Sequence, residues 1–331
     1  MKENQPAETT PWQRANTDWF RQSRWGVASH YLADTAGCQQ VTRSNTEDWN
    51  RQIDAFDVHG LARQLAEAHV PYYFISLGQN SGFYLSPNRT YDEIVGIVPS
   101  KCSRRDLVAD LAAALAPCGI RLLVYLPAGA PSNDAIAKAR LETPVDGRQT
   151  VFQRHWEAIV REWSLRWGAA VSGWWMDGPY DAAAYRHPDA PNYRSLAAAL
   201  KAGNPGALVT FNNGLRTPVY SMTEFEDFTP GEIERDLTVS PGHLPDFSRL
   251  AAYSRFIDGA QFHIYTIMGE WWGKGPVRFP DELTIGYTKF INSQGGVVTW
   301  DVPLTVGGLI EDSFRPQLAA LGAALSKPAG L

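Results

Sequence analysis

Val171-Ser-Gly-Trp-Trp-Met-Asp177-Gly-Pro-Tyr180 is the stretch that says most about the fold. It has the pattern of a short apolar β-strand that ends in a carboxylate and then a glycine. In a barrel or an open α/β sheet, side chains at the carboxyl ends of the strands surround the active-site mouth. Asp177, next to Trp174 and Trp175, is therefore placed like a nucleophile or general acid/base in a sugar-binding cleft. The same residues also fit an aspartate in a turn or at a helix start, because Asp-Gly is a common turn pair.

Apolar strand-like runs alternate with amphipathic helix patterns over nearly the whole chain. Eight strands alternating with helices fit a (β/α)8 TIM-type barrel better than a doubly wound sheet. One helix is expected to begin at a capping box, Ser103-Arg-Arg-Asp106. The expected strands lie at 25–30, 72–77, 121–126, 171–176, 207–211, 222–225, 261–267 and 297–302, and the expected helices at 58–68, 107–115, 152–167, 193–202, 247–257, 281–293 and 314–326.

The second half of the predicted barrel is irregular. Residues 212–245 are rich in loop-forming types, and the sixth strand, near 222–225, is weak. The chain ends soon after the last expected helix, so no C-terminal β-sandwich is predicted. No glycine-rich phosphate loop follows any strand, which argues against a nucleotide-dependent enzyme. We expect an N-terminal extension over residues 1–17 and a single catalytic barrel domain over residues 18–331.

The bulk composition is that of a globular protein with a large core. The chain has 331 residues, of which 44% are hydrophobic and 20% are charged, and its net charge is −5. The basic residues form no stripe, so no nucleic-acid partner is expected, and no apolar run is long enough to cross a bilayer. The first residues lack the apolar stretch of a signal peptide. The sequence as given predicts a cytoplasmic protein, or a periplasmic or secreted one if the sequence is a trimmed form, and it leaves the oligomeric state open.

Side chains that could hold a metal do not occur in the required spacing. Cys38, Cys102 and Cys118 fit neither a disulfide framework nor a zinc site. Histidine and aspartate residues with metal-ligand spacing are absent, and so is the turn that presents a nucleophilic serine. We therefore predict no metal and no cofactor.

Carboxylates and aromatic side chains dominate the residues expected at the barrel mouth. This composition is typical of glycoside hydrolases, in which an ionised acid attacks the anomeric carbon and a protonated acid donates to the leaving oxygen. Aromatic faces can also stack on sugar rings. The residues expected at the mouth are His30, Gln79, Asn80, Tyr125, Asp177, Asn212, Asn213, Glu226, Asp227, Glu232, His263, Glu270, Trp272 and Asp301.

From Asp18 to the C-terminus, the order of motifs resembles the α-L-fucosidase family of glycoside hydrolases. Each matching piece is weak alone, and it is their shared order that carries the resemblance. The pieces include Trp19-Phe-Arg-Gln-Ser-Arg-Trp-Gly-Val-Ala-Ser-His30, Ser81-Gly-Phe-Tyr-Leu85, Trp174-Trp-Met-Asp177-Gly, Asp227-Phe-Thr-Pro-Gly-Glu232 and Ile291-Asn-Ser-Gln-Gly-Gly296.

The resemblance implies a role for several residues. The family's aspartate nucleophile corresponds to Asp177, the acid/base glutamate of one branch corresponds to Glu232, and a sugar-binding histidine corresponds to His30. Two departures concern the sugar site. Gln79-Asn80 stands where the family has two adjacent histidines, and Asn213-Gly214 stands where the family has an arginine. Both departures remove cations or strong hydrogen-bond donors.

We predict a glycosidase that cleaves a terminal α-L-fucoside or a related glycoside by retaining double displacement, with a small carbohydrate or glycan as its partner. Two alternatives are the same barrel acting on a different sugar and a carbohydrate-binding protein that no longer hydrolyses. For the acid/base, Glu270 is the main alternative to Glu232, followed by Glu226 and Asp301. His263, inside an apolar run, is expected in the core. The predicted substrate-binding residues are His30, Gln79, Asn80, Tyr125, Trp174, Glu270 and Trp272.

Overall fold

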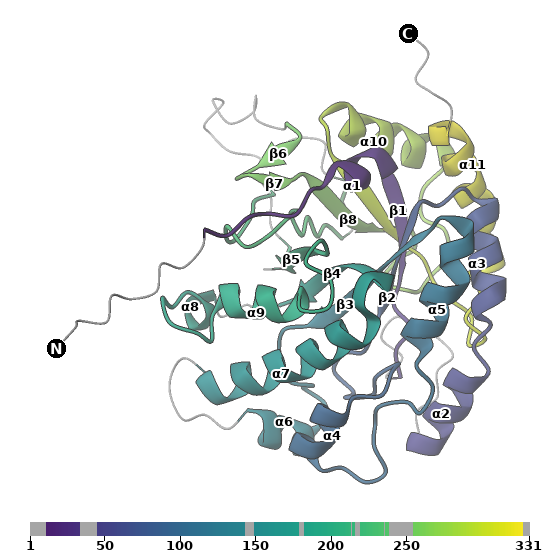
Figure 1. Cartoon of the computed structure of the whole chain (residues 1–331). Coiled ribbons are helices and arrows are strands. Elements are labelled where there is room, and N and C mark those ends of the chain that lie inside the picture. Colours follow the sequence, from purple (N-terminus) through teal and green to yellow (C-terminus); the bar gives the residue numbers. More distant parts are fainter. Residues whose placement is uncertain are drawn as a thin grey trace.

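The fold is built on one parallel β-sheet, shown in the computed structural model of Figure 1. The structure describes residues 11–33, 45–142, 149–178, 182–212, 214–215, 219–234, 236–237 and 254–326. The strands of the sheet lie in the order β5-β4-β3-β2-β1-β9-β8, and every pairing between neighbours is parallel. The strands are β1 (Trp25–Ser29), β2 (Tyr72–Ser76), β3 (Arg121–Pro127), β4 (Val171–Asp177), β5 (Leu208–Asn212), β8 (His263–Ile267) and β9 (Val297–Asp301), with β6 (Phe256–Ile257) and β7 (Ala260–Gln261) forming a separate antiparallel pair.

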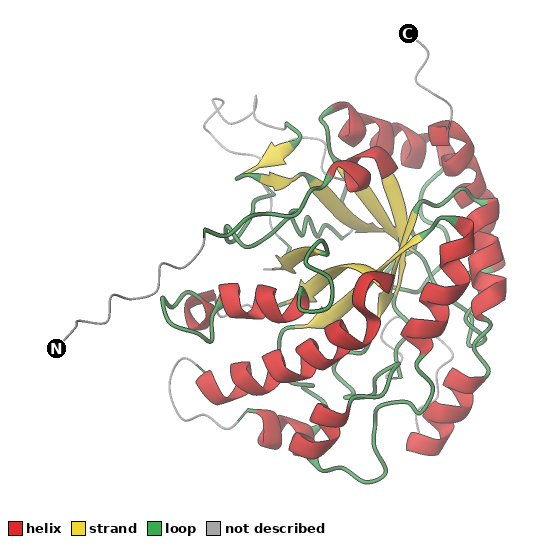
Figure 2. Ribbon diagram, viewed as in Figure 1, coloured by secondary structure: helices red, strands yellow, loops and turns green. Residues whose placement is uncertain are grey.

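Helices connect most successive strands and cover the outside of the curled sheet (Figure 2). Several begin at an asparagine or aspartate whose side chain accepts a backbone N–H of the first turn, such as Asp57 before α3 and Asn88 before α4. The helices are α1 (Asp18–Ser23), α2 (Thr46–Asp54), α3 (Val58–Glu67), α4 (Arg89–Val95), α5 (Leu107–Leu115), α6 (Ala135–Leu141), α7 (Thr150–Trp167), α8 (Ala182–Tyr185), α9 (Tyr193–Leu200), α10 (Asp281–Ser293) and α11 (Arg315–Ser326), with short 3-10 turns at Ala116–Cys118, Gly168–Ala170 and Asp312–Phe314.

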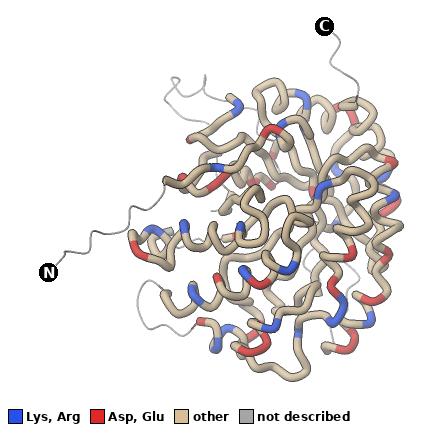
Figure 3. The backbone as a smooth tube through the Cα atoms, viewed as in Figure 1, with Lys and Arg blue, Asp and Glu red and all other residues tan. Residues whose placement is uncertain are grey.

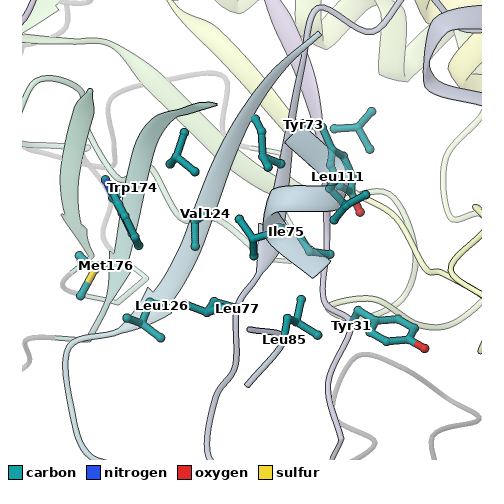
Figure 4. Close-up of a cluster of buried hydrophobic side chains, with 14 of the residues drawn as sticks. Tyr31, Tyr73, Ile75, Leu77, Leu85, Leu111, Val124, Leu126, Trp174 and Met176 are labelled. Atoms are coloured by element: carbon teal, nitrogen blue, oxygen red, sulfur yellow. The ribbon is translucent and has the colours of Figure 1, made fainter. Parts of the chain in front are cut away.

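The strands of the sheet are buried on both faces, which explains their continuous apolar runs. Successive side chains of a strand point to opposite faces, so neighbours on β4 lie in different surroundings. Trp174 and Met176 lie with Val124 in the apolar layer between the sheet and the helices (Figure 4). Trp175 points the other way, into the inside of the curl, where its ring stacks on that of Tyr125 with 5.3 Å between centroids.

Aromatic side chains close the inside of the curl at the amino ends of the strands. Phe20, on α1, packs against Tyr72 and Phe228 with 5.0 and 5.1 Å between ring centroids. His263, at the start of β8, is buried beside them; one ring nitrogen lies 3.0 Å from a backbone carbonyl and the other 2.7 Å from Thr299 Oγ1. Burial lowers the pKa of His263 to about 3. The prediction that His263 belongs to the core is confirmed, whereas its expected place at the barrel mouth is wrong because it lies at the amino end of β8.

The prediction of a sixth strand at 222–225 is wrong, because those residues form turns and bends. Instead, the irregular segment 227–233 lies between β5 and β8. Asp227 donates its backbone N–H to Val209 O of β5 at 2.8 Å, and Ile233 donates its backbone N–H to a carbonyl of β8 at 2.9 Å. The described residues therefore form a curled, seven-stranded parallel sheet, an α/β fold consistent with a TIM-like barrel.

Two predicted helix features need correction. Residues 247–253 of the predicted helix 247–257 lie outside the described residues, and Phe256–Ile257 at its other end form strand β6. The capping box at 103–106 does not form. Asp106 itself is the N-cap of α5 and accepts Ala109 N–H at 3.1 Å, because aspartate is a strong N-cap residue at the position directly before the helix.

Residues 11–17, which precede the predicted barrel domain, pack onto the fold near the irregular segment. Arg14 Nε donates to Glu226 O at 2.6 Å, and Ala15 N–H donates to Asp227 Oδ1 at 2.6 Å. Asp227 is buried and also forms an ion pair with the buried Lys201, 2.6 Å away. The start of the segment 227–233 is thus held from two sides.

Acidic and basic residues are interspersed along the chain in the view of Figure 3. Within the described ranges, none of the helices has both the length and the apolar character needed to cross a membrane.

Candidate active site

A cavity of about 170 Å³ opens at the carboxyl ends of the strands. Strand register brings polar residues level there, because Asp177 on β4 pairs with Asn212 on β5, and Ala28 on β1 pairs with Asp301 on β9. The carboxyl ends of parallel strands are where α/β proteins assemble their sites. The residues that line the cavity are His30, Gln79, Tyr125, Trp175, Asp177, Glu232, Tyr265, Trp271 and Trp272.

Two carboxyl groups of the cavity, those of Asp177 and Glu232, accept hydrogen bonds from the same amide. Asn212 Nδ2 lies 2.9 Å from Asp177 Oδ1 and 2.5 Å from Glu232 Oε2. The side-chain carbonyl of Asn212 accepts the backbone N–H of Gly214 at 3.2 Å, which fixes the orientation of the amide. Asn212 therefore holds both acids on one side of the cavity.

The irregular segment 227–233 determines where Glu232 lies. Gly231 has a φ of 60°, and a Cβ at this position would lie 1.9 Å from His263 O, so the close approach of the two backbones requires glycine. Pro230, which has no backbone N–H, accepts a hydrogen bond from Trp175 Nε1 at 3.2 Å. The chain then rejoins β8 through a bridge between Glu232 and Tyr265. This path brings the Glu232 side chain into the cavity.

Glu232 is protonated at a higher pH than an ordinary glutamate. Burial raises the pKa of Glu232 to about 7, and the neighbouring Asp177 contributes in the same direction. The hydrogen bond from Asn212 and the nearby His30 oppose the rise. A carboxyl group that keeps its proton near neutral pH can serve as a general acid.

The second oxygen of Asp177 accepts a hydrogen bond from Tyr125. Tyr125 OH lies 2.5 Å from Asp177 Oδ2, and Gln79 Nε2 donates to the same hydroxyl oxygen at 2.7 Å. Because the Gln79 amide donates to the phenolic oxygen, the hydroxyl proton of Tyr125 is left for Asp177. Burial and the charge of Asp177 raise the pKa of Tyr125 well above its usual value, so Tyr125 stays a neutral donor. Both oxygens of Asp177 are thus held in place.

His30 and Asp301 form a buried pair beside the two acids. His30 Nδ1 lies 2.6 Å from Asp301 Oδ2, and Asp301 Oδ1 accepts the backbone N–H of Gly273. Burial alone would lower the pKa of His30, but the attraction and hydrogen bond of Asp301 outweigh it, and the pKa is raised. Burial raises the pKa of Asp301, against the effect of His30. Only 5% of the surface of His30 is exposed.

Aromatic rings cover the rest of the cavity. A turn closed by reciprocal backbone bonds between Trp271 and Lys274 places Trp272 over the site. The Trp272 ring lies 5.5 Å from that of His30 and 5.0 Å from that of Tyr265, measured between centroids. Such a surface suits the apolar face of a sugar ring.

Three predicted substrate-binding residues do not line the cavity. Trp174 stacks on Trp167 of α7 at 5.7 Å, because it alternates with Trp175 and so faces the helices. Asn80 is exposed in the turn after Gln79, where its carbonyl accepts a backbone N–H. Glu270 is exposed, one position before the turn that brings the tryptophans over the site. His30, Gln79, Tyr125, Asp177, Glu232 and Trp272 do meet at the cavity.

Sequence reasoning missed four residues of the site as binding or catalytic candidates. Trp175 could have been found, because it lies two positions before Asp177 and therefore on the same face of β4. Asn212 was placed at the mouth but given no role, and its bridging position depends on where Glu232 lies. Tyr265 and Trp271 gave no distinct signal in an apolar, aromatic-rich stretch. Asn213 lies outside the described residues.

The other acids considered for the acid/base role have different surroundings. Glu226 is buried away from the cavity and accepts hydrogen bonds from Phe211 N–H at 2.8 Å and Ser221 Oγ at 2.6 Å, among others. Asp301 is buried behind His30. Among the residues that the structure describes, no group of three or more His, Cys, Asp or Glu side chains is arranged to hold a metal ion.

Neither the comparison with family models nor the comparison with curated protein sequences gives a match. Solved structures with a similar fold include the endo-fucoidan hydrolase MfFcnA4 of glycoside hydrolase family 107, with a TM-score of 0.68 and 16% identity. This chain is 93% covered, and it spans 53% of the MfFcnA4 chain. The endo-fucoidan hydrolase P5AFcnA of the same family gives a TM-score of 0.66 and 15% identity, over 93% of this chain and 94% of that one.

An α-L-fucosidase of glycoside hydrolase family 29 from Bacteroides thetaiotaomicron, solved as a trapped covalent intermediate with 2-fluoro-fucosyl fluoride, has a similar fold as well. Its TM-score is 0.63 at 16% identity, over 96% of this chain and 76% of that one. At these identities the likeness establishes the fold.

Proposed function

We propose that this chain is a glycoside hydrolase that acts on a terminal α-L-fucoside or a related glycoside. The observation that carries the proposal is the pair Asp177 and Glu232, two carboxyl groups bonded to one amide in an aromatic-lined cavity. The names of the fold neighbours, which are fucoidan hydrolases and fucosidases, support a fucose-containing substrate. The motif resemblance drawn from the sequence supports the same class.

The spacing of the acids supports a retaining mechanism. Because one nitrogen bonds both oxygens, at 2.9 and 2.5 Å, the separation of the oxygens cannot exceed the two bond lengths laid end to end. That limit, which applies to the two bonded oxygens, is closer to the separation of about 5–5.5 Å between carboxyl groups typical of retaining enzymes than to the roughly 6.5–9.5 Å that leaves room for water in inverting ones.

In the first step, an oxygen of Asp177 bonds to the anomeric carbon while the bond from that carbon to the leaving oxygen breaks. Glu232 gives its proton to the leaving oxygen, which its raised pKa allows near neutral pH. In the second step, water gives a proton to the Glu232 carboxylate, its oxygen bonds to the anomeric carbon, and Asp177 is released. Tyr125 and Asn212 hold the two oxygens of Asp177 for the attack.

One observation favours a sugar other than a simple fucoside as the second candidate. Gln79 stands where the resembling family has a histidine, and its Nε2 is already bonded to Tyr125. That bond uses one N–H of Nε2, so the second N–H and Oε1 are left to meet sugar hydroxyls, a donor and an acceptor on one amide where an imidazole presents a single ring nitrogen. The hydroxyl pattern recognised at this side of the cavity can therefore differ from that of fucosidases.

A panel of 4-nitrophenyl glycosides tests the proposal, with the α-L-fucoside as its main member. We expect hydrolysis of the α-L-fucoside, with the α-anomer as the first product seen by proton NMR. Reaction with 2-fluoro-fucosyl fluoride is expected to add one fluorofucosyl group to the peptide that carries Asp177, measured by mass spectrometry. Hydrolysis of another glycoside alone would support the second candidate, and a β-anomer as first product would contradict retention. Binding without hydrolysis of any member would contradict the enzyme.

A further inference from the structure

We propose that Asp301 is a positioning residue that fixes the tautomer of His30, so that Nε2 of His30 changes from a hydrogen-bond acceptor to a donor when the ring takes up a second proton. The inference rests on the proposed function, because it assigns Nε2 to a hydroxyl group of the bound sugar. Asp301 lies outside the cavity lining, and the inference gives it a part in the pH dependence of sugar binding.

The contacts of Asp301 determine which ring nitrogen carries the proton. A carboxylate only accepts hydrogen bonds. Asp301 Oδ2 is 2.6 Å from His30 Nδ1, and Oδ1 accepts Gly273 N–H. Burial raises the pKa of Asp301, but the two donors on its carboxyl group and the neighbouring His30 favour the ionised form. Nδ1 therefore carries a proton in the neutral ring, and Nε2 is left with a lone pair.

Nε2 is the nitrogen of His30 that is available to a ligand. His30 lines the cavity, and no described residue forms a hydrogen bond with its Nε2. In the neutral ring Nε2 can accept from a sugar hydroxyl, and in the doubly protonated ring it donates a charged hydrogen bond. A charge-assisted bond is the stronger of the two.

The charged and titratable groups around His30 come from every neighbouring part of the site. Asp301 lies on β9, Asp177 on β4 and Glu232 on the segment 227–233, and all three favour the protonated ring. Tyr125 on β3 and Tyr265 on β8 have ring centroids 5.1 and 6.4 Å from that of His30. Burial raises the pKa of both phenols well above the usual value, so they do not titrate with the histidine.

Asp301→Asn is the matched variant, because it keeps the shape of the side chain and replaces one accepting oxygen with a donating NH2 group. If the Asn oxygen accepts Gly273 N–H, the Asn amide donates to His30 Nδ1. The single proton of the neutral ring must then sit on Nε2. The variant would therefore present a donor to the cavity whether or not the ring is charged, and the turn that carries Trp272 would keep its bond to residue 301.

The first experiment measures the tautomer in the free protein. Long-range nitrogen-15 NMR of the imidazole rings, with the His30 signals assigned by their loss in His30→Gln, distinguishes a protonated nitrogen from one with a lone pair. We expect the Nδ1–H form in the natural chain at high pH and the Nε2–H form in Asp301→Asn. An Nε2–H form in the natural chain, or the same form in both proteins, would overturn the proposal. If the variant does not fold, the spectrum of the natural chain alone still shows which ring nitrogen of His30 carries the proton.

The second experiment measures the consequence for a sugar by calorimetric titration of L-fucose. Both proteins carry Glu232→Gln, so that the acid/base does not titrate. With Asp301 present, we expect affinity to fall about tenfold as rising pH removes the second proton of His30, the loss of one charged hydrogen bond. In the Asp301→Asn background the affinity should stay within about twofold. Equal pH dependence in both proteins would overturn the proposal. Absence of any L-fucose binding would count against the proposed substrate and leave the NMR result to decide the role of Asp301.

Discussion

The two ends of the curled sheet each contain a buried histidine, and the two rings have opposite protonation behaviour. His263, at the amino end, bonds a backbone carbonyl and a threonine hydroxyl, and burial lowers its pKa to about 3. His30, at the carboxyl end, is also buried, yet its pKa is raised. The difference is the carboxylate of Asp301, 2.6 Å from His30 Nδ1.

The comparison shows that burial alone does not make a polar residue structural. At the amino end, neutral partners satisfy His263 among aromatic rings, and the result is packed core. At the carboxyl end, the carboxyl groups of Asp177, Glu232 and Asp301 favour the protonated form of His30, whose ring lines the cavity. The following predictions test whether chemistry belongs to one end and stability to the other.

Among the substitutions at the carboxyl end, Asp177→Asn should cause the largest loss of hydrolysis. The amide cannot form the bond to the anomeric carbon, so we expect hydrolysis to fall by about 10^4-fold or more. Turnover of 4-nitrophenyl α-L-fucoside and the melting temperature are measured together. Retention of a tenth of the activity would remove Asp177 from the nucleophile role, while an unchanged melting temperature shows that the fold is intact.

Glu232→Gln should reduce hydrolysis by about 10²–10⁴-fold, the usual contribution of general acid catalysis. The acid must be protonated to act, and its pKa is about 7, so activity of the natural chain should fall as pH rises above about 7. The variant should lose this alkaline fall. A pH profile of kcat at saturating substrate for both proteins measures it, because the weaker sugar binding expected when His30 loses its second proton does not enter kcat at saturation. An alkaline limb of kcat that persists in the variant would assign the titration to another group.

Asp227→Asn tests the amino end. Asp227 forms a buried ion pair with Lys201 and accepts the backbone N–H groups of Ala15 and Val209. Removing its charge leaves the buried ammonium of Lys201 without its carboxylate, although its Nζ still lies 5.5 Å from the centre of the Trp12 ring. The loss costs about 3–5 kcal/mol and should lower the melting temperature by about 4–7 °C. Asp54→Asn, which makes the same change at an exposed site, is the control. Equal melting temperatures for the two variants would show that the pair does not support the fold.

His263→Gln and His30→Gln should shift the pH dependence of stability in opposite directions. The folded-state pKa of His263 lies below its unfolded value of about 6.5, so this residue costs stability as pH falls from about 6.5 to 3, by about 1.4 kcal/mol per pH unit. His30 has a raised pKa, so its contribution is present at low pH and is lost as pH rises through that value. Urea unfolding at pH 7 and pH 5 should show His263→Gln losing less stability on acidification than the natural chain, and His30→Gln losing more. If both variants changed the stability lost between pH 7 and pH 5 in the same direction, the contrast between the two histidines would be contradicted.

Much of the fold was predictable because strands buried on both faces leave continuous apolar runs in the sequence. The polar residues that end such runs, His30 and Asp177, were predictable for the same reason. The segment that takes the place of the sixth barrel strand was not predictable. The proline and glycine of 227–233 give it an irregular backbone, and its location depends on contacts with β5 and β8.

Which side chains contact each other in the site was harder to predict than which residues lie at the strand ends. His30 and Asp301 are separated by 271 positions, and their contact requires knowing that β1 and β9 are neighbours. The pairing of Glu232 with Asp177 through Asn212 depends on the irregular segment, so periodicity could not supply it. Trp174 was assigned to the site without applying the alternation of side chains along β4, which would have selected Trp175.

The two adjacent tryptophans of β4 also have a consequence for how such a gene can change. A single codon gained or lost just before Trp174 would exchange the faces of the residues that follow, unless the strand slipped to compensate. The indole now stacked on α7 would turn inward, and the acid would turn away from Asn212. Length variants in this lineage should therefore accumulate in the connections between strands, while β4 tolerates only replacements in place.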